Sequence, residues 1–156
     1  MTEQQQVSDD GVMTRIGQAT MLLHGGDREE ARNRLGRLWE QLGPDGDPLH
    51  RCTLAHYMAD AQDDPDSELA WDLRALLAAE GPGGERRGDD AAVALRALSP
   101  TLHLNLAVDY LKVLRPDAAR VHLDRALAAS ESLDDDEYGS RVRAAIARLE
   151  VRFRSP

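Results

Sequence analysis

Residues 104–128 constrain the fold most, because they predict two helices that pack against each other. Apolar residues recur there at the three- and four-residue spacing of an amphipathic helix, and Pro116 interrupts that spacing. Ala107, Ala119 and Ala126 fall where two neighbouring helices would touch, and small residues let helices approach closely. We therefore predict a helical hairpin that turns just before Pro116.

The composition favours helices along the whole chain. The 156 residues are 42% hydrophobic and 4% aromatic, with many Ala and Leu and few β-branched residues. This length suits one domain with a buried core. We predict a single all-α domain over residues 11–156, preceded by a disordered leader at residues 1–10, because that first segment is largely polar.

Cap and turn signals divide the rest of the chain into further helices. Gly25-Gly26 and Gly43-Pro44 end two helices, whereas Asp47-Pro48 and Ser99-Pro100 place a capping residue before a proline, as helix starts do. Residues 81–88 hold four glycines and one proline, which predicts a flexible loop. The expected helices span residues 12–24, 27–42, 48–61, 65–79, 89–98 and 134–153, together with the pair in residues 104–128, which Ser99-Pro100 opens.

The succession of hairpins resembles the tetratricopeptide repeat, a helix-turn-helix unit of roughly 34 residues that stacks into α-solenoids. Aligning the small residue of each second helix, Ala31, Ala70 and Ala119, gives three units. Residues 50–60 and 68–80 are also similar to tetratricopeptide-type proteins of actinobacteria that have no assigned function. The units here are longer than the family's and lack its early tryptophan, so an irregular helical bundle is the alternative.

The resemblance implies a right-handed superhelix of three helical hairpins, closed by a capping helix at the C-terminus. It also implies a binding scaffold whose first helices line a concave groove. Polar residues recur along two of these helices at spacings that share one helix face. We predict that this groove binds a protein or peptide through Thr53, His56, Asp60, His103, Asn105, Asp109 and Lys112.

Two other interpretations of the same residues stay open. One is a metal or small-molecule site, with the potential for catalysis, built on His50, His56, Asp60 and His103, because His and carboxylate groups one helical turn apart bind metals and exchange protons. The other is a solvated helix face. No catalytic triad and no phosphate loop is recognisable, so we expect a protein that is not an enzyme and needs no metal or cofactor.

Charge and cysteine content narrow the class of partner and the compartment. The net charge of −9 disfavours nucleic acid and anionic membranes as partners. No stretch approaches the roughly 18 apolar residues of a membrane span, and the single Cys52 fits a reducing cytoplasm. Five arginines in residues 141–154 either form a docking strip or favour the helix C-terminus. A homodimer through this last helix is a further hypothesis.

Overall fold

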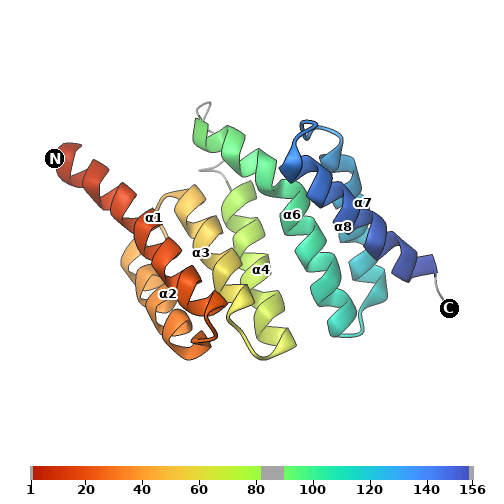
Figure 1. Ribbon diagram of the computed structural model, residues 1–156, viewed down its shortest axis with the longest axis horizontal. Helices are drawn as coiled ribbons and strands as arrows, with labels where there is room; N and C mark the ends of the chain where they lie inside the picture. Colours follow the sequence, from red (N-terminus) through yellow and green to blue (C-terminus); the bar gives the residue numbers. More distant parts are fainter. Residues whose placement is uncertain (1, 82–89, 155–156) are drawn as a thin grey trace.

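The computed structural model describes residues 2–81 and 90–154, which form seven α-helices and no strand (Figure 1). The all-α class predicted from composition is therefore confirmed. The side chains of residues 1–10 and of residue 91 lie outside the described part. The helices are α1 (Thr2–His24), α2 (Arg28–Leu42), α3 (Pro48–Asp60), α4 (Pro65–Glu80), α6 (Asp90–Lys112), α7 (Pro116–Ser130) and α8 (Glu137–Arg154).

Successive helices pack side by side in the order of the chain (Figure 1). α1 pairs with α2, α3 with α4, and α6 with α7. The second helix of each pair also contacts the first helix of the next one, and α7 contacts α8 in the same way. In addition, α1 contacts α3, α3 contacts α6, and α6 contacts α8. The helices that begin each pair therefore form one continuous layer that ends with α8.

The predicted break at Ser99-Pro100 is wrong. Pro100 lies inside α6, which runs without interruption from Asp90 to Lys112. A proline inside a helix removes one backbone hydrogen bond and favours a kink, and α6 changes direction midway along its length (Figure 1). Pro100 is completely buried. Its packing explains why the helix continues, since tertiary contacts override the local preference to stop.

The N-terminal end of the expected domain differs from the sequence prediction. α1 begins at Thr2 rather than at Val12, so helical backbone extends through the segment predicted as a disordered leader. That segment holds three glutamines and one glutamate, which are good helix formers. The predicted flexible loop at residues 81–88 lies, apart from Gly81, outside the described residues and stays a prediction.

The core is a row of three apolar clusters rather than one central mass. The first joins α1, α2 and α3 around Ile16 and Leu35, the second joins α3, α4 and α6, and the third joins α6, α7 and α8. Small residues lie at the closest helix contacts, because Ala31, Ala107 and Ala119 are fully buried. Ala70, which the repeat alignment places with them, is only partly buried.

Two tryptophans connect the first and second helix pairs. Trp39 of α2 and Trp71 of α4 meet edge to face, with ring centroids 5.2 Å apart. The guanidinium of Arg51 lies 4.2 Å from the Trp39 ring centre, and that of Arg74 lies 4.3 Å from the Trp71 ring centre. Such contacts add to the stability that burial of the rings provides.

We predict that Leu35→Ala lowers the free energy of unfolding by about 2–5 kcal/mol, because it leaves a cavity in a fully buried site. Leu77→Ala is the matched control: Leu77 is 72% exposed, so its loss should change the free energy by less than about 0.5 kcal/mol. Urea denaturation followed by circular dichroism measures both. Equal effects of the two substitutions would contradict this description of the core.

Candidate functional site at the contact of α3 and α6

The structure joins the two polar stripes predicted from sequence through one contact. The side-chain amide Nδ2 of Asn105, on α6, lies 3.3 Å from Nδ1 of His56, on α3. An amide nitrogen only donates, so Nδ1 of His56 accepts and carries no proton. Burial lowers the pKa of His56, although the neighbouring Asp60 opposes this effect. His56 is thus a neutral imidazole whose proton sits on Nε2.

Carboxylates lie beside this contact on α3 and α4. Asp60 is one helical turn after His56, and desolvation raises its pKa, while His56 acts in the opposite direction and Glu68 adds to the rise. Lys112, at the end of α6, donates a hydrogen bond of 2.9 Å from Nζ to Oε1 of Glu68. This bond raises the pKa of Lys112. The cation predicted for the groove is therefore already paired with a carboxylate of the same protein.

A buried pair of carboxyl groups lies beneath these residues. Asp72 of α4 and Asp109 of α6 are only 4% and 3% exposed and are hydrogen-bonded to each other. Burial raises the pKa of Asp72 to about 10, and the bond to Asp109 adds to the rise. Burial also raises the pKa of Asp109, to about 6, although accepting the bond from Asp72 opposes this. Asp72 therefore holds the proton that it donates to Asp109.

The buried pair is incompletely satisfied. Oδ1 of Asp72 and Oδ2 of Asp109 are sealed from solvent and have no hydrogen-bond partner among the described residues. Such unpaired buried oxygens destabilise a fold. Cys52 lies close enough that Asp72 contributes, after burial, to raising the pKa of its thiol to about 12. A thiol held in its neutral form is a poor nucleophile, so Cys52 acts as a small buried hydrophobe.

His103 does not join this surface. Its Nδ1 lies 3.0 Å from Nδ1 of His122 on α7, and its Nε2 lies 3.4 Å from Oε1 of Glu80 on α4. His103 precedes Asn105 by two positions, which places the two side chains on nearly opposite faces of α6. Burial lowers the pKa of both histidines, that of His122 to about 4. Both rings are therefore neutral and lie in the interior between α6 and α7.

The four residues proposed for a metal site do not converge. His50 is buried near the start of α3, with its Nδ1 unpaired among the described residues. His56 and Asp60 face α6 and α4, whereas His103 faces His122. Within the described part of the chain, no group of three or more His, Cys, Asp and Glu residues has an arrangement that could hold a metal ion.

Two pockets open beside the contact of His56 and Asn105. The first has a volume of about 200 Å³ and lies between α3, α6 and the start of α8. Tyr138 closes one side of it, since its hydroxyl lies 2.7 Å from Thr101 Oγ1 and donates to the carbonyl oxygen of Ala97. The first pocket is lined by Cys52, Thr53, His56, Tyr57, Leu98, Thr101, Leu102 and Tyr138.

The second pocket, of about 350 Å³, lies between α6 and α8. Asn105 lines it as well as contacting His56, so the polar surface continues from α3 across α6 to α8. Arg148 and Arg152 of α8 line its other side. Two other arginines of α8 differ, because Arg143 donates to backbone carbonyls before α8 and Arg154 pairs with Glu150.

Sequence analysis missed Asp72 and Tyr138. Asp72 could have been found, because it lies within the apolar face of α4, three residues after Leu69 and four before Leu76. A carboxylate at such a position signals a buried polar contact. Tyr138 gave no local signal, since it reaches the pocket only through the packing of α8 against α6.

Among the described helices, none is long and apolar enough to cross a membrane.

We predict that Asp72→Asn reduces the pH dependence of stability. Folding raises the pKa of both carboxyl groups, so the folded state retains protons that the unfolded chain releases. Stability from this pair is therefore present below about pH 4 and is lost as the pH rises. Between about pH 5 and pH 8 the wild type should lose on the order of 4 kcal/mol more than the variant.

Denaturant titration at the two pH values measures this difference. Asp124→Asn on α7 is the control, because it removes an exposed carboxylate whose ion pair with a described residue is the one to Arg120. The control should show the same pH dependence as the wild type. If Asp72→Asn also matches the wild type, the pair does not share a proton in the way described.

No protein-family model, no curated protein and no solved structure matches this chain.

Proposed function

We propose that this protein is a tetratricopeptide-like interaction module that binds a protein or peptide along the surface formed by α3, α6 and α8. The contacts of α1, α3, α6 and α8 in succession support such a solenoid, because stacked hairpins bring their first helices together in this way. The observation that carries the proposal is the hydrogen bond between His56 and Asn105 beside the pocket of about 200 Å³. We call this surface, including both pockets, the groove.

The size of the first pocket favours a peptide side chain over a free small molecule. Sites for small molecules commonly enclose about 300–1,000 Å³, and this pocket is smaller. Leu98, Leu102 and the rings of Tyr57 and Tyr138 supply apolar surface, which suits one apolar side chain of a partner. The pocket thus resembles the anchor point of a peptide rather than a complete ligand site.

Polar groups at the edge of the pocket suit a peptide backbone. Nδ1 of His56 accepts from Asn105, so its Nε2 is left as a hydrogen-bond donor. A donor beside an apolar pocket can receive a backbone carbonyl while the adjacent side chain enters the pocket. His56 and Asn105 would then fix the register of the bound segment.

Charge along the groove favours an orientation of the partner. Asp60 and Glu68 make the α3–α4 end acidic, and Lys112 compensates only one of the two. Arg148 and Arg152 make the α8 end basic. A segment with a basic residue at one end and an acidic residue at the other, separated by an apolar anchor, complements this pattern.

The proposal also covers cofactors, the compartment and self-association. Binding through the groove needs no catalytic group, metal or cofactor, and the buried, unpaired Cys52 suits a reducing cytoplasm. Self-association through α8 would use the exposed face of this helix, since Val142, Ile146 and Leu149 are already buried in the third apolar cluster. No specific observation on the described residues favours the metal or small-molecule alternative.

We predict that the triple variant His56→Ala/Asp60→Ala/Asn105→Ala loses its partner. Affinity purification from a lysate of the native host, read by mass spectrometry, should recover a protein with the wild type. The triple variant should recover about tenfold less of it, because both the donor and the acidic side of the groove are gone.

The control is Arg120→Ala/Asp124→Ala, which removes an exposed ion pair on α7 and leaves the groove intact. It should recover the partner as well as the wild type does. Circular dichroism of each variant establishes that it is folded. A partner recovered equally by the wild type and the triple variant would place the binding surface elsewhere.

A further inference from the structure

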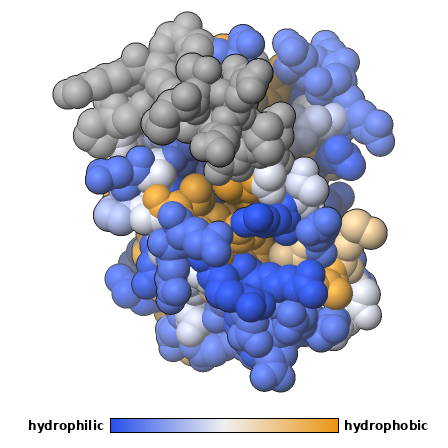
Figure 2. Space-filling view, turned by 90° about the vertical axis from the view of Figure 1, so that its left-hand side faces the viewer, coloured by the Kyte–Doolittle hydropathy of each residue, from blue (hydrophilic) through white to orange (hydrophobic). Residues whose placement is uncertain are grey.

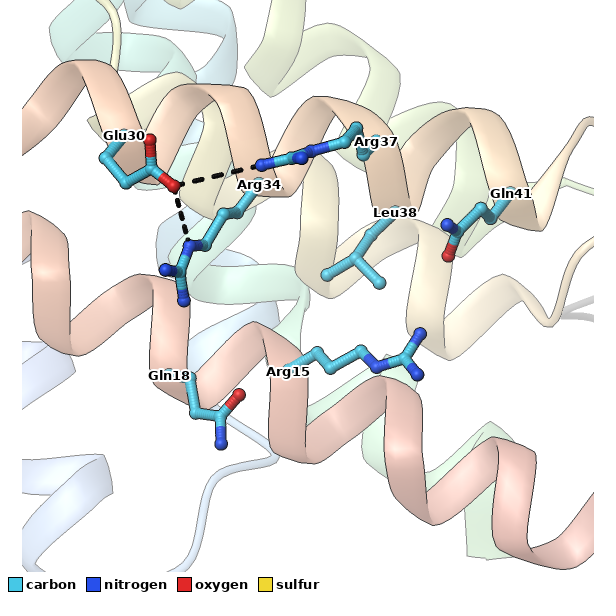
Figure 3. Close-up of a pocket in the computed structure, with 7 residues that line it drawn as sticks. All are labelled: Arg15, Gln18, Glu30, Arg34, Arg37, Leu38 and Gln41. Atoms are coloured by element: carbon cyan, nitrogen blue, oxygen red, sulfur yellow. Dashed lines mark hydrogen bonds and ion pairs between the residues drawn. The ribbon is translucent and has the colours of Figure 1, made fainter.

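A pocket separate from the groove lies at the opposite end of the molecule, between α1 and α2. Its volume is about 450 Å³. In the view of this end, apolar atoms form a strip that is bordered below by hydrophilic surface (Figure 2). Leu38, which is 5% exposed, lines the pocket and points into the space between the two helices (Figure 3). The pocket is lined by Arg15, Gln18, Glu30, Arg34, Arg37, Leu38 and Gln41.

Three guanidinium groups surround this pocket against a single carboxylate. Glu30 uses one oxygen, Oε1, for both of its ion pairs, at 2.9 Å from Arg34 Nε and 3.8 Å from an Arg37 nitrogen (Figure 3). Arg15 reaches the pocket from α1 and has no polar partner among the described residues. The charged groups that line the pocket therefore carry a local excess of two positive charges in a protein whose net charge is −9.

The arrangement suits a ligand with two negative charges. Arginine forms paired hydrogen bonds with carboxylate and phosphate oxygens, and three arginines from two helices can surround such a group. Gln18 and Gln41 add amide donors on opposite sides of the pocket (Figure 3). Leu38 offers an apolar floor for a short carbon chain, and the volume lies in the range of small-molecule sites.

We propose that this pocket binds a small organic dianion, either a phosphate monoester or a dicarboxylate, with Arg15, Arg34 and Arg37 as its cationic ligands. The charge balance carries the proposal, because one dianion neutralises the excess that Glu30 leaves. Arg37 is held by Glu30 at 3.8 Å only, so it can turn toward the ligand at little cost. The site is independent of the groove and does not require that the groove binds a partner.

Isothermal titration calorimetry with the full-length protein tests this proposal. The probes are glycerol phosphate, succinate and, as a monoanion of similar chemistry, acetate. One of the two dianions should bind at least about tenfold more tightly than acetate, and its binding should weaken as sodium chloride is added, since salt screens charge pairs. Whichever dianion binds more tightly identifies the source of the charge as phosphate or carboxylate.

Substitutions assign the binding to this pocket. Arg15→Gln and Arg37→Gln should each weaken binding about tenfold, because each removes a charged hydrogen-bond donor. Arg141→Gln is the matched control: it removes the same charge from an exposed position on α8. It should leave binding unchanged. Thermal unfolding without ligand shows whether a variant is folded, and the second arginine variant replaces the first if one is not.

Two results would overturn the proposal. One is the absence of binding heat with both dianions at millimolar concentrations. The other is an equal loss of affinity in Arg15→Gln, Arg37→Gln and Arg141→Gln, which would reflect the overall charge of the protein instead of a site.

Discussion

The packing of α6 against four other helices is the constraint on which the rest of the structure depends. α6 contacts α3, α4, α7 and α8, and its residues enter both the second and the third apolar clusters. Leu106 and Ala107 are completely buried at the centre of this contact. Because the backbone of α6 is held from several sides, the polar residues between its apolar ones take fixed positions. Asn105 and Asp109 are placed in this way.

The buried carboxyl pair between α4 and α6 makes the fold less stable than an apolar contact there would. Asp72 and Asp109 lie where an apolar pair would stabilise α4 against α6 more strongly. In the described part of the chain, each leaves one oxygen without a partner. The shared proton reduces the charge that must be buried. We interpret the pair as a contact that holds α4 and α6 together beneath the groove. Asp109 lies on the same helix as Asn105 and Lys112, and Lys112 donates a hydrogen bond to Glu68 of α4. Removal of the Asp72–Asp109 pair should therefore alter the electrostatics of the groove as well as the stability of the fold.

Sequence patterns predicted the helices better than they predicted which face each helix presents. Glycine and proline marked the turns near residues 25, 43 and 115, because these residues act through local backbone geometry. The contact between His56 and Asn105 agrees with the predicted stripes. Pro100 was misread, since burial in the core outweighs its local preference to end a helix. His103 was also placed wrongly, because its direction depends on His122, nineteen residues away. Sequence alone could not show the contact between His103 and His122.

Photo-crosslinking in the native host shows directly whether a partner binds in the groove. A photoreactive amino acid at Thr53, which lines the pocket of about 200 Å³, would react only with a molecule seated there. The same amino acid at Val121, exposed on α7, serves as the reference. If a partner binds in the groove, we expect a discrete crosslinked protein from position 53 and none from position 121. No product at position 53, or the same product from both positions, would contradict it.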